Sequence, residues 1–303
     1  MKLVTFQIAG RPAERRSRPG ALIDEGRAVV ELQAASVLAI AEGGQNALDR
    51  AAQTVKRPPA EAVFRIADVV LLAPIPQPPQ MRDFLCFEKH LKQGFEAIAK
   101  MRGTEARIPK IWYERPIFYH PNRFNVCGTG TEVQWPAYSE NMDFELEFGC
   151  YIGLPGKDIP KSRAREHIFG YTIFNDFSAR DEQTKDMMGQ LGPGKGKDFD
   201  NSNVMGPCLV TADELTDPYN LEMKVRVNGE EWGRGHSSEM HWKFEDCIAH
   251  ISRSETLHPG EFLGSGTVGN GCGLEHMKFL KPGDTVELEV EGIGILRNRI
   301  VKT

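Results

Sequence analysis

Residues 143–148, Asp-Phe-Glu-Leu-Glu-Phe, alternate between acidic and apolar side chains and run directly into the mostly apolar segment 149–153. In a strand, this alternation places Glu145 and Glu147 on one face and the apolar side chains on the other. The apolar continuation is typical of an interior strand that is covered on both faces. The segment therefore predicts a β-rich fold that buries an acidic pair, and such a pair needs compensation.

Two interpretations of the acidic pair are open at this point. Carboxylates at alternate positions of a strand are about 7 Å apart and raise each other's pKa unless water or a cation relieves them. The pair belongs either to a solvated edge strand or to a site for a hard metal ion. Residues 286–291 show how weak the pattern is alone, because their alternating glutamates are predicted to form only a wet sheet face.

Composition narrows the class of protein. The chain has 303 residues and a formal net charge of −5, without the long basic run that a nucleic-acid groove requires. Its six cysteines never form Cys-x-x-Cys, which argues against a zinc site or a redox pair. No segment resembles a signal-peptide core or is apolar for long enough to span a bilayer. We predict a soluble cytoplasmic protein with no nucleic-acid or membrane partner.

The N-terminal region shows hairpin and helix signals. Residues 2–32 are short apolar alternations broken by glycine and proline, which is typical of hairpins. Ser36 is suited to cap a helix over 37–41, and a second helix is predicted near 47–55.

A proline-rich segment follows and predicts a domain boundary. Residues 73–79 contain four prolines and suit neither a helix nor a central strand. We predict a small N-terminal α+β domain over residues 1–75 and a β-dominated catalytic domain over 76–303. Within the second domain, residues 81–101 are predicted to be helical, and strands recur from Glu145 to the end.

A third acid candidate stands at the end of an apolar strand. Residues 170–175 are mostly apolar and lead into Asp176. Ser178 and Asp181 have the spacing of a capping box that opens a helix. This gives Asp181 a structural role and favours Asp176 as a ligand.

Four more residues extend the candidate site. Arg180 and Gln183 are three apart on one predicted helix face, so they either orient a polar substrate or form an ordinary surface. Asp83 is predicted to open a helix on which His90 follows two turns later, on the same face, and the histidine is either functional or structural. An oxygen-only ligand set would suit Mg²⁺, Mn²⁺ or Ca²⁺ rather than zinc, and its members would be Asp83, Glu145, Glu147 and Asp176.

Two glycine-rich segments have open interpretations. Residues 189–197 contain Gly-x4-Gly-Lys, as in a phosphate loop, but Gly196 stands where Ser or Thr should hold Mg²⁺. The alternative is a mobile loop with glycine hinges that delivers Lys197 to an anionic substrate or oxyanion. Residues 263–273 contain five glycines, so their backbone either approaches a ligand closely or forms a plain loop between strands.

Five motifs follow one another in a specific order: Asp143-Phe-Glu-Leu-Glu147, Asn175-Asp-Phe-Ser-Ala-Arg-Asp181, Lys197-Asp-Phe-Asp200, Gly264-Ser-Gly-Thr267 and Leu296-Arg-Asn-Arg299. With them, the chain from Arg82 to the C-terminus resembles the fumarylacetoacetate hydrolase family. The resemblance implies that family's mixed β-sandwich roll, an α+β and β-dominated fold, and a homodimer. It also implies that His90 pairs with Glu275.

The resemblance assigns expected roles to individual residues. The matched positions are, for the metal, Asp83, Glu145, Glu147 and Asp176; for catalysis, His90, Glu275 and Lys197; and for the substrate, Arg180, Gln183, Tyr119 and Thr267. The segment between Lys92 and Tyr119 is predicted to cap the site and to set substrate size.

The implied reaction is hydrolysis of a carbon-carbon bond in a 1,3-dicarbonyl or acylpyruvate-type 2,4-dioxo acid, in aromatic or related carbon catabolism, with Mg²⁺ or Mn²⁺. In it, His90 deprotonates a water that attacks a carbonyl, while Lys197 and Gln183 stabilise the oxyanion. The alternative is decarboxylation, isomerisation or hydration of an oxaloacetate-like 2-oxo acid by the same metal chemistry. Retention of Asp83, His90 and Glu275 favours the hydrolase, because hydrolysis must activate water. A third interpretation is a structural ion without any reaction.

Overall fold

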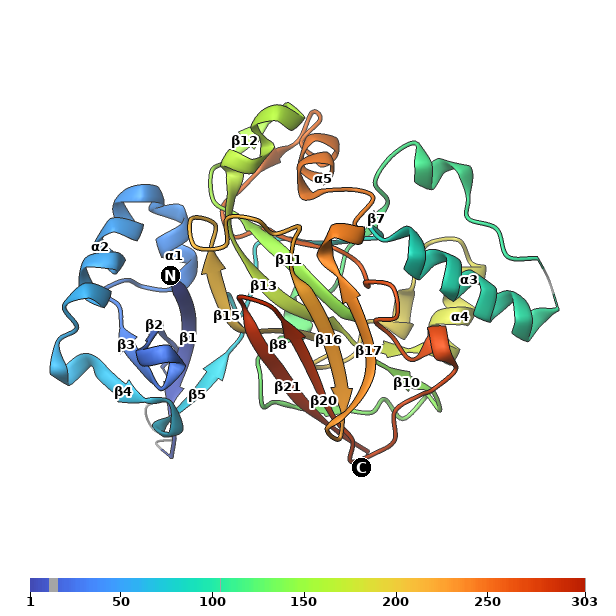
Figure 1. The fold of residues 1–303 in the computed structure, drawn as a ribbon, viewed down its shortest axis with the longest axis horizontal. Coiled ribbons are helices and arrows are strands. Elements are labelled where there is room, and N and C mark those ends of the chain that lie inside the picture. Colours follow the sequence, from blue (N-terminus) through green and yellow to red (C-terminus); the bar gives the residue numbers. More distant parts are fainter. Residues whose placement is uncertain (11–15, 104, 303) are drawn as a thin grey trace.

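The computed structural model describes residues 1–10, 16–103 and 105–302, and strands dominate it (Figure 1). The strands of the larger sheet are β1 (Lys2–Ile8), β2 (Arg18–Ile23), β3 (Ala28–Glu31), β4 (Val63–Arg65), β5 (Val69–Leu72), β6 (Met81–Phe84), β7 (Phe118–Tyr119), β8 (Val126–Cys127), β11 (Leu146–Ile152), β13 (Ile168–Asp176), β15 (Asn203–Thr211) and β19 (Phe262–Gly264). Their spatial order is β4-β3-β2-β1-β15-β13-β11-β19-β6-β7, with β5 beside β1 and β8 beside β15.

A second sheet packs against the first. Its strands are β9 (Glu132–Gln134), β16 (Glu222–Val227), β17 (Glu230–His236), β20 (Thr285–Val290) and β21 (Gly294–Val301), in the order β17-β16-β20-β21-β9. Short pairs join β10 (Met142–Asp143) to β14 (Ser178–Ala179) and β12 (Gly156–Lys157) to β18 (Thr256–Leu257). The α-helices are α1 (Val37–Glu42), α2 (Gly44–Lys56), α3 (Glu88–Arg102), α4 (Arg180–Met188) and α5 (Phe244–Ile251). This is the strand-rich α+β fold that the sequence predicts.

The strand predicted from residues 143–153 lies inside the molecule. Every residue of β11 is buried, and Phe144, Leu146 and Phe148 belong to the core between the two sheets. The opposite face of β11 carries Glu147 and then Tyr151, which packs in a second core cluster with the N-terminal segment. The acidic pair is therefore buried, and the alternative of a solvated edge strand is wrong.

The glutamates of β20 behave differently, as predicted. Val286, Leu288 and Val290 are buried, whereas the side chains of Glu287 and Glu289 remain 13% and 34% exposed. Glu287 and Glu289 form ion pairs with arginines of neighbouring strands. The same alternation thus gives a wet face wherever no second layer covers it.

The prediction of a helix over residues 81–101 is wrong at its start. Residues 81–84 form β6, which pairs in parallel with β19 and antiparallel with β7. All four are buried, so their backbone groups need strand partners, and the helix α3 begins only at Glu88. Asp83 and His90 therefore do not share a helix face, although both lie beside one cavity.

The N-terminal region forms the predicted hairpins and helices. Ser36 caps α1 by accepting a hydrogen bond from the Ala39 amide at 3.0 Å, and α2 covers the predicted second helix. Residues 11–15 of the predicted hairpin region lie outside the described residues. β1 pairs with β15, so the two predicted domains share one sheet, and their division at residue 75 stays a prediction.

Two global properties follow from the described ranges. None of the helices within them combines the length and apolar character that crossing a bilayer requires. The six cysteines are buried and carry free thiols.

Candidate active site

A cavity of about 300 Å³ lies at the β6-β7 end of the larger sheet and is lined by residues of β6, β7, β11, α3 and α4. Its polar lining includes Asp83, His90, Tyr119, Glu145, Glu147, Arg180, Gln183, Lys197 and Thr267. Asp176 and Glu275 lie behind this lining and contact Lys197 and His90, respectively. The structure therefore brings every candidate residue from the sequence to one place.

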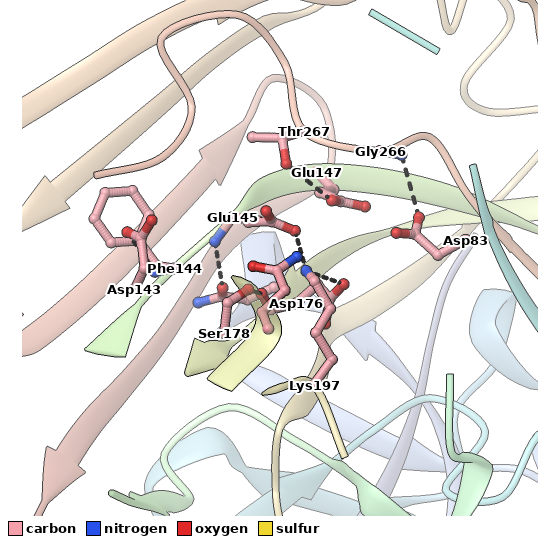
Figure 2. Close-up of polar contacts among 12 residues, drawn as sticks. Asp83, Asp143, Phe144, Glu145, Glu147, Asp176, Ser178, Lys197, Gly266 and Thr267 are labelled. Carbon is pink, nitrogen blue, oxygen red and sulfur yellow. Dashed lines mark hydrogen bonds and ion pairs between the residues drawn. The ribbon is translucent and has the colours of Figure 1, made fainter. Parts of the chain in front are cut away.

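Three carboxylates converge at the inner end of the cavity. Asp83 on β6, Glu147 on β11 and Asp176 at the end of β13 each offer an oxygen, and these oxygens lie within 4.8 Å of one another. Figure 2 shows the three side chains entering the same space from separate strands. The Gly266 amide donates to Asp83 at 3.2 Å and the Thr267 hydroxyl to Glu147 at 3.2 Å. Backbone and hydroxyl donors thus hold two of the carboxylates in place.

Crowding and burial change the acidity of these three groups. Burial, together with the charge of Asp176, raises the pKa of Asp83 to about 8. Burial, partly offset by a nearby lysine, raises the pKa of Asp176 to about 6. Burial and the charge of Asp83 hold the pKa of Glu147 well above its ordinary value. Without a further positive charge, the three groups resist full ionisation.

Glu145 is in a different electrostatic position. Its carboxylate forms ion pairs with two cations: Oε2 lies 2.5 Å from Lys197 Nζ, and Oε1 lies 2.8 Å from Arg180 Nη2. Burial opposes ionisation, but these two cations lower the pKa of Glu145 to about 2. Lys197 also donates to Asp176 at 2.6 Å, and despite its burial these carboxylates raise its pKa. Glu145 stands at the edge of the carboxylate trio and connects it to the cationic side of the cavity.

The donor set fits a hard divalent cation. Among the described residues, Glu147 Oε2 and Asp176 Oδ1 are buried without a hydrogen-bond donor, and burying such oxygens unpaired is costly. An all-oxygen trio with a fourth carboxylate at its edge matches the ligands that Mg²⁺, Mn²⁺ or Ca²⁺ prefer. His90, Cys272 and Glu275 also lie within 4.8 Å of one another, but burial keeps the Cys272 pKa well above its ordinary value, so its thiol stays protonated.

His90 and Glu275 form a hydrogen-bonded pair beside the trio. His90 Nδ1 lies 2.9 Å from Glu275 Oε1, and Glu275 Oε2 accepts the Cys272 amide at 3.0 Å. Both side chains are buried or nearly so. Because Nδ1 faces Glu275, Nε2 is the imidazole nitrogen that remains for another partner. The pair joins α3 to the turn Leu274–His276.

Asp143 is a component of the site that sequence reasoning gave no role. Its carboxylate accepts from Arg180 Nε at 2.8 Å and from the backbone amides of Gly273 and Leu274 at 2.8 and 2.9 Å. It therefore ties Arg180 to the turn that carries Glu275. Its place in the motif 143–147 was the only signal, and its partners lie far away in the sequence.

The predicted capping box at the start of α4 is wrong. The helix begins at Arg180 without a side-chain cap, and Ser178 donates to the Asp176 carbonyl instead. Asp181 still has a structural role, because it accepts from the Ser139 hydroxyl at 2.6 Å. Arg180 and Gln183 share a helix face as predicted, and Arg180 donates to the Gln183 amide oxygen at 2.9 Å.

The predicted cap segment contributes only part of its residues to the cavity. Phe95, Ile98 and Ile117 line it, and the Tyr119 hydroxyl donates to Asp176 at 2.6 Å. Trp112 instead donates to the Leu85 carbonyl from a buried position outside the lining. Tyr119 is thus a residue of this segment that contacts the acid cluster directly.

The two glycine-rich segments contribute to the site in different ways, one by close packing and the other by positioning a lysine. A Cβ at Gly264 would come within 2.3 Å of an Asp83 oxygen, and one at Gly266 within 2.1 Å of the Phe84 carbonyl. The close approach is therefore to β6, the strand that carries Asp83. The segment 189–197 brings Lys197 to two carboxylates, whereas Lys195 bonds the Asp198 carbonyl.

Fold and site together define the class as a strand-rich α+β protein of the fumarylacetoacetate hydrolase type. The family profile "Fumarylacetoacetate (FAA) hydrolase C-terminal" matches residues 80–301, and the chain belongs to this family. The sequence resemblance and the fold it implied are thereby confirmed.

Individual relatives differ in the reactions that their names describe. "Oxaloacetate tautomerase fahd2, mitochondrial" of Xenopus laevis is 31% identical over 308 residues, covering 99% of this chain and 90% of that protein. "Oxaloacetate tautomerase YisK" of Bacillus subtilis is 33% identical over 254 residues, covering 82% and 80%. The solved structure of a fumarylacetoacetate hydrolase from Exiguobacterium antarcticum is 25% identical, covers 100% of both chains and superposes with a TM-score of 0.78.

Proposed function

We propose that this protein is a divalent-cation-dependent tautomerase, which moves a proton between C3 and the 2-oxo oxygen of a 2-oxo acid. Tautomerisation is a form of the isomerisation that the sequence left open, beside decarboxylation and hydration, as the alternative to hydrolysis. The names of the relatives support it better than hydrolysis of a carbon-carbon bond. The observation that carries the proposal is a buried imidazole-carboxylate pair, His90 and Glu275 at 2.9 Å, beside the carboxylate trio. Such a pair can remove a C–H proton as well as activate water, so the names of the relatives are what favour the tautomerase over the hydrolase.

The residues that would hold the cation are Asp83, Glu147 and Asp176, with Glu145 as the fourth acid of the site. A Mg²⁺ or Mn²⁺ ion bound there would supply Lewis-acid polarisation of the 2-oxo group and so acidify the neighbouring C–H.

His90 is the proposed base that removes the C3 proton. In the tautomer with Nδ1 protonated, Nδ1 donates to Glu275 and the Nε2 lone pair is available to the substrate. Glu275 stabilises the imidazolium that forms when Nε2 accepts the proton, and return of this proton from Nε2 to the 2-oxo oxygen completes the proposed enol. The Cys272 amide fixes Glu275 in turn, so the base keeps its orientation through the reaction.

Lys197 is the proposed donor toward the substrate oxygens. Its ammonium lies between Glu145 and Asp176, at the margin of the trio. A 2-oxo group bound beside the trio would place its developing negative charge near this ammonium. Arg180 donates a hydrogen bond to the side-chain oxygen of Gln183. The Gln183 side-chain NH2 group is therefore proposed as a second donor to the substrate. Such fixed donors stabilise developing negative charge without having to reorganise.

Hydrolysis is the second candidate, because the structurally similar Exiguobacterium protein is named a hydrolase. The same His90 would then activate a water molecule. The two reactions differ in outcome: a tautomerase equilibrates keto and enol forms and leaves the carbon skeleton intact.

The test is to follow fresh oxaloacetate and an acylpyruvate by ultraviolet absorbance and product mass, with Mg²⁺, with Mn²⁺ and with chelator. Faster keto-enol equilibration without loss of mass supports the proposal. Two smaller acids would indicate hydrolysis, and release of carbon dioxide would indicate decarboxylation. Loss of the effect with chelator and in His90→Ala ties it to this site. The homodimer and the cytoplasmic location remain predictions.

A further inference from the structure

The cavity continues past its charged end into an apolar slot. One wall is a stripe of α3 at helical spacing, formed by Leu91, Gly94, Phe95 and Ile98. The remaining apolar lining includes Leu85, Ile117, Phe118 and Met187. Figure 1 shows α3 and α4, the helices that carry Phe95 and Met187, flanking this end of the molecule. Such a stripe normally packs against a core, whereas this one faces a cavity.

Charge is confined to the inner end of the cavity. Among the lining residues that the structure describes, the lysine and arginine side chains are Lys197 and Arg180. Lys197 already pairs with Glu145 and Asp176, and Arg180 with Glu145 and Asp143. A second carboxylate at the far end of a substrate would therefore find no unpaired lysine or arginine among these lining residues and would face mostly apolar side chains. Placing a charge against apolar side chains without a partner costs free energy, whereas an apolar tail gains from the same contacts.

Gly94 gives a second, independent indication. It is buried and lines the cavity, yet a Cβ at this position would find no atom within 4 Å. Glycine weakens a helix interior compared with alanine, and the backbone here is ordinary helix. The missing side chain therefore leaves open space in the slot, in the middle of the apolar stripe.

We propose, building on the tautomerase function above, that the substrate is a 2-oxo acid whose chain beyond the reacting carbon is uncharged and apolar. The 2-oxo acid end lies at the carboxylates and His90. The tail follows α3 past Gly94 toward Ile98 and contacts Ile117 and Met187. The helix rises by roughly 10 Å between Leu91 and Ile98, which accommodates a tail of several carbons.

The test measures exchange of the C3 proton with deuterated solvent by NMR, with Mg²⁺, for 2-oxobutanoate, 2-oxohexanoate, 2-oxooctanoate, phenylpyruvate and oxaloacetate. We expect kcat/KM to rise about fourfold for each methylene added within the slot. We expect kcat/KM for oxaloacetate to be lower than kcat/KM for 2-oxohexanoate. A higher kcat/KM for oxaloacetate than for every apolar-tailed acid would overturn the inference.

Variants of α3 locate the tail. Gly94→Leu fills the slot, so the ratio of kcat/KM for 2-oxooctanoate to that for 2-oxobutanoate should fall at least tenfold. Phe95→Ala widens the slot and should shift the preference toward longer or aryl tails. Glu96→Leu adds the same side chain as Gly94→Leu on the exposed side of the same helix and should keep the wild-type ratio. Equal ratios in Gly94→Leu and Glu96→Leu would contradict the slot.

A binding measurement separates this inference from the proposed function. N-alkyl oxamates keep two adjacent carbonyl groups and have no C3 proton, so calorimetry of their binding to the Mg²⁺-loaded protein needs no turnover. A Kd that tightens with alkyl length and loses this dependence in Gly94→Leu supports the slot even if no acid exchanges its proton, an outcome in which the tautomerase proposal fails. A Kd independent of alkyl length overturns the slot whatever the activity.

Discussion

Asp143 and Arg180 form a buried ion pair, 2.8 Å from Oδ2 to Nε, and Arg180 also lines the cavity. The same carboxylate receives two backbone amides of the turn that carries Glu275. One side chain therefore connects the cation that holds Glu145 with the residue that orients His90.

Asp143→Asn should destabilise the protein strongly. Asparagine cannot balance the Arg180 charge, and breaking a buried ion pair costs roughly 3–5 kcal/mol. Urea unfolding measures the change in the free energy of unfolding. Asp49→Asn, at an exposed helix position, is the control and should stay within about 0.5 kcal/mol of wild type. Equal urea midpoints for the two variants would show that the Asp143–Arg180 ion pair does not stabilise the fold to this extent.

His90→Ala should lower the rate of C3 proton exchange by about 10²–10⁴, the usual contribution of a general base. Glu275→Gln keeps a hydrogen-bonding group but removes the charge that stabilises the imidazolium, so we expect a loss of at least about tenfold. His276→Ala changes the exposed neighbour of Glu275 and is the control. Full activity of Glu275→Gln would mean that His90 works without a carboxylate partner.

Metal-free protein should lose stability as the pH rises from about 5 to about 8. Burial raises the pKa of Asp83 to about 8 and that of Asp176 to about 6, whereas both are near 3.9 in an unfolded chain. The folded state therefore binds more protons in this range, and its stability falls until Asp83 ionises in the folded state as well.

Bound Mg²⁺ should remove this pH dependence, because the cation compensates the ionised carboxylates. The difference in Tm between Mg²⁺-loaded and chelated protein should thus grow from about pH 5 to about pH 8. Thermal unfolding at several pH values measures it. Glu147→Gln, which removes one proposed ligand, should abolish most of the gain. A difference that is constant with pH would contradict the assigned cation site.

Gly266→Ala should damage the Asp83 position. Gly266 has φ +73°, and a Cβ there would come within 2.1 Å of the Phe84 carbonyl. Gly130→Ala is a matched control, because Gly130 has φ +79° with nothing within 4 Å of a Cβ. The control should cost about 1–2 kcal/mol from the left-handed backbone alone.

Gly266→Ala should cost more than this and should also weaken Mg²⁺ affinity at least tenfold, because the Gly266 amide donates to Asp83. Calorimetric titration with Mg²⁺ measures the affinity of both variants. Unchanged affinity in Gly266→Ala would mean that this amide does not position Asp83.

Local patterns predicted the elements whose neighbours are close in sequence. The interior strand at 146–152, the N-terminal hairpins and the Ser36 cap follow from alternation and capping chemistry. β6 was missed because its four residues show no strand pattern, and its partners β19 and β7 come from far along the chain.

The sequence predicted which residues form the site better than it predicted how they are arranged. The family motifs pointed to its acids and to the pair of His90 and Glu275, but not to Lys197 lying between two carboxylates. A stripe such as Leu91, Phe95 and Ile98 looks the same in sequence whether it faces a core or a cavity. Only the fold distinguishes the two.

The pairing of β1 with β15 has a consequence for solubility. β15 has β13 along one side, while its other side is shared by β1 near Val210 and β8 near Asn203. Without β1, part of β15 would present unpaired amides and carbonyls as an open edge, which is a template for aggregation with another chain. β1 thus covers part of this edge of β15. Removing β1 should therefore cause precipitation before it lowers the catalytic activity.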